Sequence, residues 1–372
     1  LYDKNLKRID GETLENKFIN EIKYVDEEIV VINCEKGAVE YGHFLVATLD
    51  KFWYLFDDRY RHLKNLKIVL TCEKWEKWFD FLILLGFQKE QIMILTDVNV
   101  CQFKKCFVPE PSFTWGNAKA NFQFCKIGDY LRSNAPNTYN YEKIYFSRTS
   151  FDNNRNRSDV LVNRKIYGEQ QIENIFRKNG FEIIHPNKYS IAQQMSLLKN
   201  CKVLAGVSGS ALHQSLFLQN GSEVIMLGRN DVLCGIVCQS NIDRLKEHKV
   251  FYIEANVSPI ADANTYSMVN SIIGVNFYLK RFFDENGYLY NEDDLQVDRN
   301  DFIDYLIDFG YLQQSFKREI NSCRKVASIE MESMIQKKYP KFLVNFMCVF
   351  IIDKNKRDLM RKKYLKIKKR KY

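Results

Sequence analysis

Short apolar runs along the chain alternate with longer segments in which apolar residues recur every three or four positions. In the first part of the chain, the runs predict buried strands at residues 28–32, 66–70 and 91–95. The periodic segments between them predict helices at residues 42–60 and 75–85, and Gly86 predicts the carboxyl-terminal cap of the second. Strands that alternate with helices are typical of a parallel sheet covered by helices on both faces.

The same alternation returns after a segment rich in Pro and Asn, residues 107–140, in which one helix is predicted near residues 127–133. The second set of apolar runs predicts strands at residues 144–147, 181–185, 203–206, 223–227 and 249–253. Helices are predicted between them at residues 168–179, 191–200 and 210–218. From residue 265 onward the apolar spacing is typical of helices, and amphipathic helices are predicted at residues 268–283, 299–308 and 313–336.

The chain has 372 residues, more than the about 250–300 that one core usually holds. We therefore predict two Rossmann-like α/β domains, a helical region that packs back on them, and a tail. Their predicted ranges are 1–140, 141–256, 257–340 and 341–372. Two facing domains of this kind place a ligand between the carboxyl ends of their strands.

The net charge of +9 comes from the tail. Residues 351–372 hold eleven Lys and Arg against two Asp, so the rest of the chain is neutral and no basic groove is indicated there. Three interpretations of the tail stay open. Residues 342–372 could form an amphipathic helix on a membrane surface, a solubilising end or a nucleic-acid contact. The last is the least favoured, and no nucleic-acid partner is expected.

The ten cysteines show no paired spacing of the zinc-finger kind, which favours reduced thiols in a cytoplasmic protein. No secretory or membrane-spanning segment is recognised in the sequence. The doublets Asp57-Asp58 and Asp293-Asp294 lack the apolar flanks of a metal-binding pair. We therefore predict no metal and no other cofactor.

Residues 144–217 have the order of a nucleotide-binding half-domain that ends in the turn Ser208-Gly209-Ser210-Ala211. A glycine-rich turn between a buried strand and a helix aims N–H groups and the positive helix end at an anion. Gly209 permits close approach of the backbone, and the two serine hydroxyls can donate to phosphate. We predict that this turn binds the diphosphate of an activated sugar. The alternative is a tight packing turn.

Arg148 follows the first strand of this half-domain and is predicted to emerge at the carboxyl edge of the sheet. Its guanidinium fork matches phosphate oxygens. Arg157 and Arg164, in the loop that follows, are further candidates, although each could equally be a solvated charge. His185 ends the next strand and is predicted to line the same donor site.

The order of several motifs resembles glycosyltransferase family 61. The matching positions are Tyr145–Arg148, Arg164–Ile166, Glu169, Gly180–Glu182, Pro186, Gln194 and Gly206–Leu212, preceded by a histidine motif at His43–Leu45 with Thr48-Leu49 behind it. The resemblance implies a GT-B fold, a nucleotide-sugar donor, no essential metal and inversion at the anomeric carbon. It also implies a role in building capsule, lipopolysaccharide or other surface glycans. The first domain would bind an oligosaccharide or lipid-linked acceptor, and the second the donor.

Inverting transfer needs a base for the acceptor hydroxyl. His43 is the candidate, because a neutral imidazole can act near pH 7, and Asp50 is the reserve. The resemblance makes Glu169 the holder of an arginine and places Gln194 on the donor side. Charge–dipole placement at a helix start is the alternative for Glu169. His213 is predicted to be a capping or packed histidine.

Five positions depart from the family pattern. Ala47 stands for a Glu, Gly168 for an Asn, Ser208 for a His, Gln214 for an Asn and Met226 for an acidic residue. These departures motivate a second interpretation, in which the chain is a catalytically weakened glycosyltransferase-like scaffold in a polysaccharide-assembly complex. The favoured interpretation is an inverting, metal-independent glycosyltransferase, peripheral at the inner face of the plasma membrane if the tail binds lipid.

Overall fold

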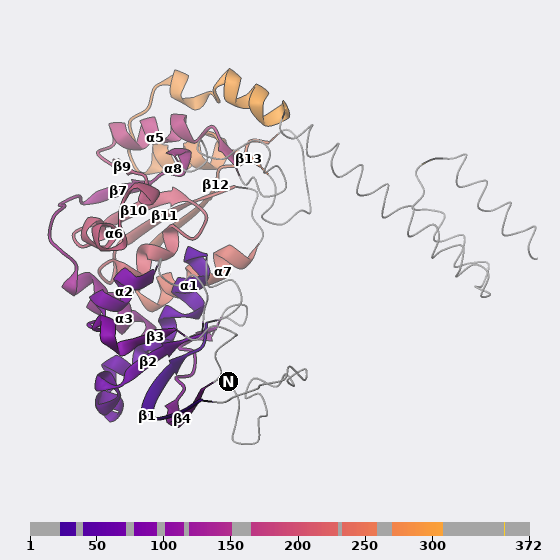
Figure 1. The fold of residues 1–372 in the computed structure, drawn as a ribbon. Coiled ribbons are helices and arrows are strands. Elements are labelled where there is room, and N and C mark those ends of the chain that lie inside the picture. The colour runs from indigo at the N-terminus through magenta and orange to yellow at the C-terminus, as the bar shows by residue number, and fades with distance from the viewer. Residues whose placement is uncertain are drawn as a thin grey trace, which may run out of the picture. The chain divides into compact units, whose positions relative to one another are not determined.

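The computed structural model describes residues 23–34, 40–71, 78–94, 101–114, 119–150, 165–229, 233–258, 270–307 and 353 (Figure 1). The chain divides into two compact units, Leu1–Tyr305 and Leu306–Tyr372. Both predicted α/β domains fall within the first unit, and the domain boundaries inside it stay predictions. The predicted helix at residues 313–336 lies outside the described residues, as does the tail except for residue 353. No helix in the described ranges is long and apolar enough to cross a membrane.

The first sheet is parallel, with the strand order β3-β2-β1-β4. Its strands are β1 (Lys23–Ile32), β2 (Lys67–Leu70), β3 (Ile92–Ile94) and β4 (Cys101–Phe107). The three predicted strands of this domain are confirmed, whereas the sequence did not predict β4. This strand lies at the edge of the sheet and most of its side chains are exposed or half-buried, so it carries no apolar run.

The single helix predicted at residues 42–60 is wrong. The segment forms α1 (Tyr41–Ala47) and two 3-10 helices, η1 (Leu49–Phe56) and η2 (Asp58–Asn65). Thr48 leaves the helical region at φ −134° and Asp57 is extended at φ −115°. The Asp57 carboxylate accepts a hydrogen bond from the Arg59 backbone N–H at 3.0 Å, which starts the next helix. Apolar periodicity alone does not reveal such breaks.

The second sheet is also parallel, with the order β12-β11-β10-β7-β9. Its strands are β7 (Lys143–Phe146), β9 (Glu182–Ile184), β10 (Val203–Val207), β11 (Glu223–Gly228) and β12 (Lys249–Glu254), so all five predictions are confirmed. The chain runs outward from β7 to β9 and then returns past β7 to β10. In open parallel sheets, ligands bind at the carboxyl ends of the strands beside such a reversal.

Helices cover both faces of the second sheet (Figure 1). The described helices of this part are α5 (Glu169–Lys178), α6 (Ile191–Leu198), α7 (Leu233–Leu245), α8 (Phe277–Glu285) and the 3-10 helices η6 (Pro186–Lys188) and η7 (Leu212–Phe217). The helix predicted at residues 210–218 is therefore a shorter 3-10 helix. The start predicted at residue 268 is wrong, because β13 (Ser271–Ile272) pairs with β8 (Ile166–Tyr167) and the Asn276 side chain caps α8. Residues 299–307 are helical, as predicted.

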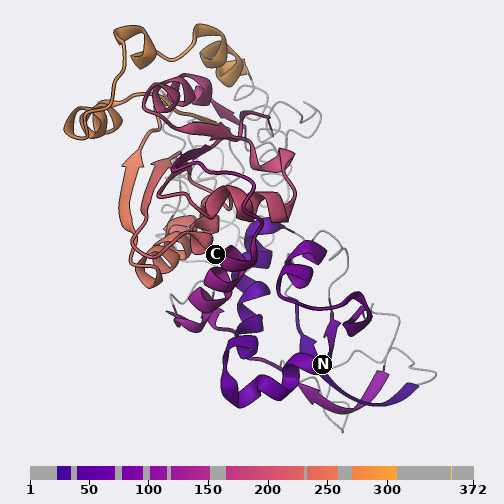
Figure 2. The ribbon, with the colours of Figure 1, turned by 90° about the vertical axis from the view of Figure 1, so that its left-hand side faces the viewer.

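The two sheets share one hydrophobic core. Figure 2 shows helices lying between the two sheets. The core joins apolar side chains of α1, α2 (Phe79–Leu84) and α3 (Gln123–Asn134) to those of α6, η7 and the second sheet. The rings of Phe81 and Phe217 lie 6.1 Å apart across this boundary. Gly128 of α3 permits an even closer contact, because a Cβ atom there would lie 2.4 Å from the Leu216 carbonyl oxygen. The helices of the first domain therefore pack directly on the second.

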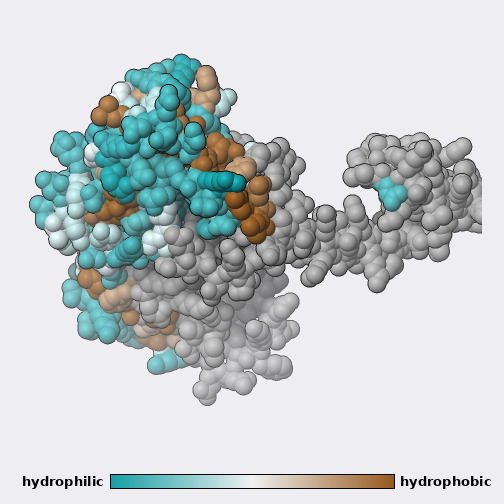
Figure 3. Space-filling view, turned by 90° about the horizontal axis from the view of Figure 1, so that it is seen from above, coloured by the Kyte–Doolittle hydropathy of each residue, from teal (hydrophilic) through white to brown (hydrophobic). Residues whose placement is uncertain are grey.

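The opposite face, over α5 and α8, is largely hydrophilic (Figure 3). Exposed apolar side chains interrupt it, among them Phe277, Tyr278 and Leu289. Scattered apolar groups of this kind are normal on a protein surface.

Candidate functional site

The carboxyl ends of β7 and β10 lie side by side at the reversal of strand order, since Phe146 pairs with Gly206. β7 leads into Arg148, and β10 leads into the turn Ser208–Ala211. Gly209 has φ +155°, and a Cβ atom built on it would lie 3.5 Å from Nη1 of Arg148. The structure thus brings the Arg148 guanidinium over the glycine of the turn.

The backbone of this turn presents N–H groups. Ser208 N donates to the Leu227 carbonyl at 2.8 Å, and Leu212 N donates to the Gly209 carbonyl at 3.0 Å. The N–H groups of Gly209, Ser210 and Ala211 make no hydrogen bond within the part of the chain that the structure describes. Consecutive N–H groups beside a guanidinium suit a phosphate. Because η7 is a short 3-10 helix, a helix dipole adds little here, and these N–H groups are the candidate anion-binding feature of the turn.

Arg229, which the sequence analysis did not single out, supports the turn from its other side. It follows β11, the neighbour of β10, and its side chain is 8% exposed. Its Nε donates to the Ser208 carbonyl at 3.0 Å. The sequence did carry a signal for Arg229, because it directly follows a predicted buried strand, much as Arg148 follows β7. The turn is therefore flanked by two positive charges.

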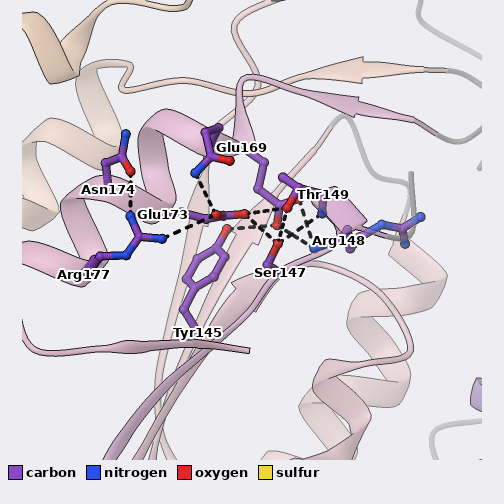
Figure 4. Close-up of polar contacts among 9 residues, drawn as sticks. Tyr145, Ser147, Arg148, Thr149, Glu169, Glu173, Asn174 and Arg177 are labelled. Carbon is purple, nitrogen blue, oxygen red and sulfur yellow. Dashed lines mark hydrogen bonds and ion pairs between the residues drawn. The ribbon is translucent and has the colours of Figure 1, made fainter. Parts of the chain in front are cut away.

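Glu169 is the first residue of α5 and is 1% exposed. Its carboxylate accepts hydrogen bonds from the Tyr145 hydroxyl at 3.2 Å and from the Arg148 backbone N–H at 3.2 Å (Figure 4). Burial, followed by the carboxylates of Glu169 and Glu173, raises the pKa of Tyr145 well above its ordinary value. Glu169 thus orients the backbone of Arg148, and whether it also holds an arginine side chain stays a prediction.

Glu173 lies one turn further along α5, is 1% exposed and was not singled out from the sequence. Its Oε1 accepts hydrogen bonds from Ser147 Oγ at 2.6 Å and from Thr149 Oγ1 at 3.0 Å. Figure 4 shows both carboxylates beside the end of β7, on the α5 side, with the Arg148 side chain directed away from them. The sequence did carry a signal for Glu173, because two acidic residues four positions apart lie on the same face of a helix. Glu169 and Glu173 together therefore hold the backbone around Arg148 in place, and the Arg148 side chain extends from this fixed segment.

Gly168 explains one departure from the family pattern. It has φ +78°, and a Cβ atom there would lie 2.1 Å from the Ile273 carbonyl oxygen. No side chain fits this position, so the family's Asn could not be accommodated here. Met226 is 3% exposed in β11 and belongs to the shared core, so its side chain does not lie at the edge where a ribose would bind.

Gln194 and Gln214 form a buried amide pair. Gln194 Nε2 donates to the carbonyls of Pro186 and Tyr189, each at 3.0 Å, and its Oε1 accepts from Gln214 Nε2 at 2.9 Å. Both amide hydrogens of Gln194 are therefore used inside the protein. The pair ties the loop after β9 to η7, and direct contact of Gln194 with a donor stays a prediction.

His185 ends β9 at the same sheet edge, next to Ser147, whose N–H donates to the Ile184 carbonyl at 2.8 Å. Burial lowers the pKa of His185, against the opposing effect of Glu173. The ring is therefore neutral near pH 7, consistent with a position that lines a site. The other two predicted donor residues, Arg157 and Arg164, lie outside the described residues.

The first domain reaches the turn through α1. A Cβ atom on Gly42 would lie 2.6 Å from Cβ of Ser210, so Gly42 packs directly against the Ser210 side chain and has no room for a side chain of its own. His43, half-buried, is the next residue of α1. Asp50 is fully buried, and its carboxylate accepts a hydrogen bond from the Phe113 N–H at 3.2 Å. The structure brings the His43 motif to the turn, whereas Asp50 lies in the interior.

A polar cluster lies behind the turn, between η7 and α7. His213 is 8% exposed, and its Nδ1 lies 3.0 Å from Gln239 Oε1. Burial lowers the pKa of His213, while Gln239 raises it and nearby His43 lowers it further. His248 Nε2 lies 3.0 Å from the Ser215 carbonyl, and burial lowers the pKa of His248 to about 4. The prediction of a packed histidine at 213 is confirmed.

Among the residues that the structure describes, no group of three or more His, Cys, Asp and Glu side chains could hold a metal ion. The described cysteines are free thiols; Cys125, Cys201 and Cys238 are buried, whereas Cys106 is exposed.

Residues 41–225 match the family model described as Glycosyltransferase 61. The match supports membership of glycosyltransferase family 61. It runs from α1 to β11, so it includes the Gly42 contact, Arg148, both buried glutamates and the turn. At the general level it supports a glycosyltransferase, as the sequence predicted. No curated protein matches the chain.

The Gly42–Ser210 contact predicts a coupled pair of substitutions. Gly42→Ala should lower the free energy of unfolding by about 1–3 kcal/mol, because the new methyl group collides with Ser210. In a Ser210→Gly background the same change should cost much less, since the collision is removed. Urea unfolding of the four proteins measures the coupling. Strictly additive effects would show that Gly42 and the Ser210 side chain are not in contact.

His248 predicts a pH dependence of stability. Its pKa falls from 6.5 to about 4 on folding, so unfolding takes up a proton below pH 6.5. The resulting stability is present above pH 6.5 and is lost as the pH falls toward 4, by up to about 3 kcal/mol. His248→Gln keeps a donor for the Ser215 carbonyl but cannot titrate. The stability advantage of the wild type should therefore shrink between pH 7 and pH 4 in urea titrations, and a constant difference would contradict the assignment.

Proposed function

We propose that the protein is an inverting, metal-independent glycosyltransferase of the GT-B type. It transfers a sugar from a nucleotide-sugar donor to a surface-glycan acceptor of the capsule or lipopolysaccharide class. The family match supports the transferase class. The observation that carries the donor side is the Arg148 guanidinium over a turn whose three N–H groups have no internal partner in the described chain.

The donor diphosphate binds this turn. Its oxygens accept hydrogen bonds from the N–H groups of Gly209, Ser210 and Ala211, and Arg148 adds charge-assisted bonds. Arg229 holds the Ser208 carbonyl and adds positive charge behind the turn. Preorganised donors of this kind stabilise the negative charge that develops on the leaving group, and this is the main way a site accelerates such a reaction.

The acceptor enters from the side of α1, where Gly42 meets Ser210. His43 takes the proton of the acceptor hydroxyl as that oxygen bonds to the anomeric carbon, on the face opposite the diphosphate. The bond between the anomeric carbon and the diphosphate oxygen breaks, and its electron pair leaves with the diphosphate. Displacement from the opposite face inverts the anomeric carbon.

The reaction is proposed to occur in the cytoplasm, at the inner face of the plasma membrane. Residues 342–372 pair an apolar stretch with the eleven basic residues near the end of the chain, a composition that suits an anionic membrane surface. Such an anchor would bring the site to a lipid-linked acceptor.

Arg148→Ala should remove donor binding without unfolding the protein. Loss of one charge-stabilising group in such sites costs about 10²–10³-fold in rate. The first measurement is a thermal shift with UDP-, GDP-, CMP- and dTDP-sugars, with and without EDTA. We expect stabilisation by one nucleotide class, independent of EDTA and absent in the variant.

Arg281→Ala is the matched control, because this exposed arginine on α8 pairs only with Glu285 in the described chain. It should bind the donor as the wild type does. Full transferase activity in Arg148→Ala would contradict the proposed donor site. Nucleotide binding without hydrolysis or transfer to any glycan would favour the scaffold interpretation instead.

A further inference from the structure

The polar cluster behind the turn determines which nitrogen of His213 carries a proton. Gln239 of α7 is 1% exposed, and its Nε2 donates to Ser215 Oγ at 2.8 Å and to Asp243 Oδ1 at 2.9 Å. A primary amide has two hydrogens, so both are used. The Gln239 Oε1, which faces His213, is therefore an acceptor.

Nδ1 of His213 must then be the donor across its 3.0 Å contact with Gln239 Oε1. In a neutral imidazole the other nitrogen, Nε2, is left with a lone pair. Reversing the amide of Gln239 would place its oxygen against the Asp243 carboxylate, where the two would repel. Asp243 is itself held, since its Oδ2 accepts a hydrogen bond from the Tyr252 hydroxyl at 2.6 Å. The arrangement therefore has one consistent assignment.

The ring is neutral near pH 7, because burial lowers the pKa of His213 and His43 lowers it further. Nε2 makes no hydrogen bond to the described part of the chain. His213 lies on η7, two residues after Ala211, so the same short helix that follows the donor turn carries this lone pair. Gly42 of α1 contacts Ser210, three residues before His213, so the start of η7 lies beside α1.

We propose that His213 is a sugar-binding residue whose Nε2 accepts a hydrogen bond from a hydroxyl of the donor sugar. This inference rests on the proposed function. A neutral imidazole with a lone pair repels phosphate oxygens, which are acceptors, but it binds a hydroxyl, which is a donor. The ring therefore recognises the sugar and not the diphosphate. Gln239 and Asp243 are positioning residues that hold it in the binding tautomer.

Nitrogen-15 NMR of the full chain tests the tautomer directly, and only five histidines contribute signals. His213→Gln identifies the His213 signals by their loss. We expect the Nδ1–H tautomer in the wild type. Gln239→Met, which offers no acceptor, should give a mixture. An Nε2–H tautomer in the wild type would overturn the proposal.

Ligand binding tests the role of the lone pair. The probes are the four nucleotide sugars and the matching free nucleoside diphosphates, compared by thermal shift. His213→Phe should weaken binding of the nucleotide sugar about tenfold, as expected for one lost hydrogen bond, and leave the free diphosphate unchanged. His213→Gln supplies an amide oxygen and should restore part of the loss.

Equal effects of His213→Phe on both ligands, or no effect on either, would overturn the sugar-binding role alone. Failure of the wild type to bind either kind of ligand would overturn the proposed function and this role with it. The tautomer measurement would still decide whether Gln239 and Asp243 hold His213 in the Nδ1–H tautomer.

Discussion

The direct contact of Gly42 with Ser210 is the constraint on which the candidate site depends. It joins the first helix of one α/β domain to the turn that follows β10 in the other. Gly128 makes a second contact of this kind with the Leu216 carbonyl. Because neither glycine has room for a side chain, the helices of the first domain pack closely on η7 and its turn. A common core behind them keeps this packing in place.

The second constraint is a pair of buried carboxylates. Glu169 and Glu173 leave solvent at a considerable cost, which is compensated by hydrogen bonds from Tyr145, Ser147, Thr149 and the Arg148 backbone. Both lie one turn apart on α5 and fix the exit of β7 from that side. The guanidinium then extends from a rigid point toward Gly209. Charge burial in this region serves the orientation of one arginine, which is how preorganised sites are usually supported.

The departures from the family pattern do not all have the same meaning. Gly168 is required by the backbone, and Gln214 bonds to Gln194, so these two positions are integrated into this fold. Ser208 contributes its backbone, which bonds to Leu227 and Arg229. The same chain carries an imidazole at His213, on the short helix that follows the turn. The polar groups around the turn are therefore rearranged and not simply lost.

The sequence by itself determined the two sets of parallel strands, most of the helices near them, and the positions of Arg148 and the turn, because apolar runs and glycines act locally. It did not reveal β4, whose exposed edge carries no apolar signal, or the breaks at Thr48 and Asp57. The sequence held signals for Glu173 and Arg229, but it did not reveal which groups they contact. Only the tertiary structure decided these, because they depend on contacts between residues far apart in the chain, and periodicity along the chain does not record such contacts.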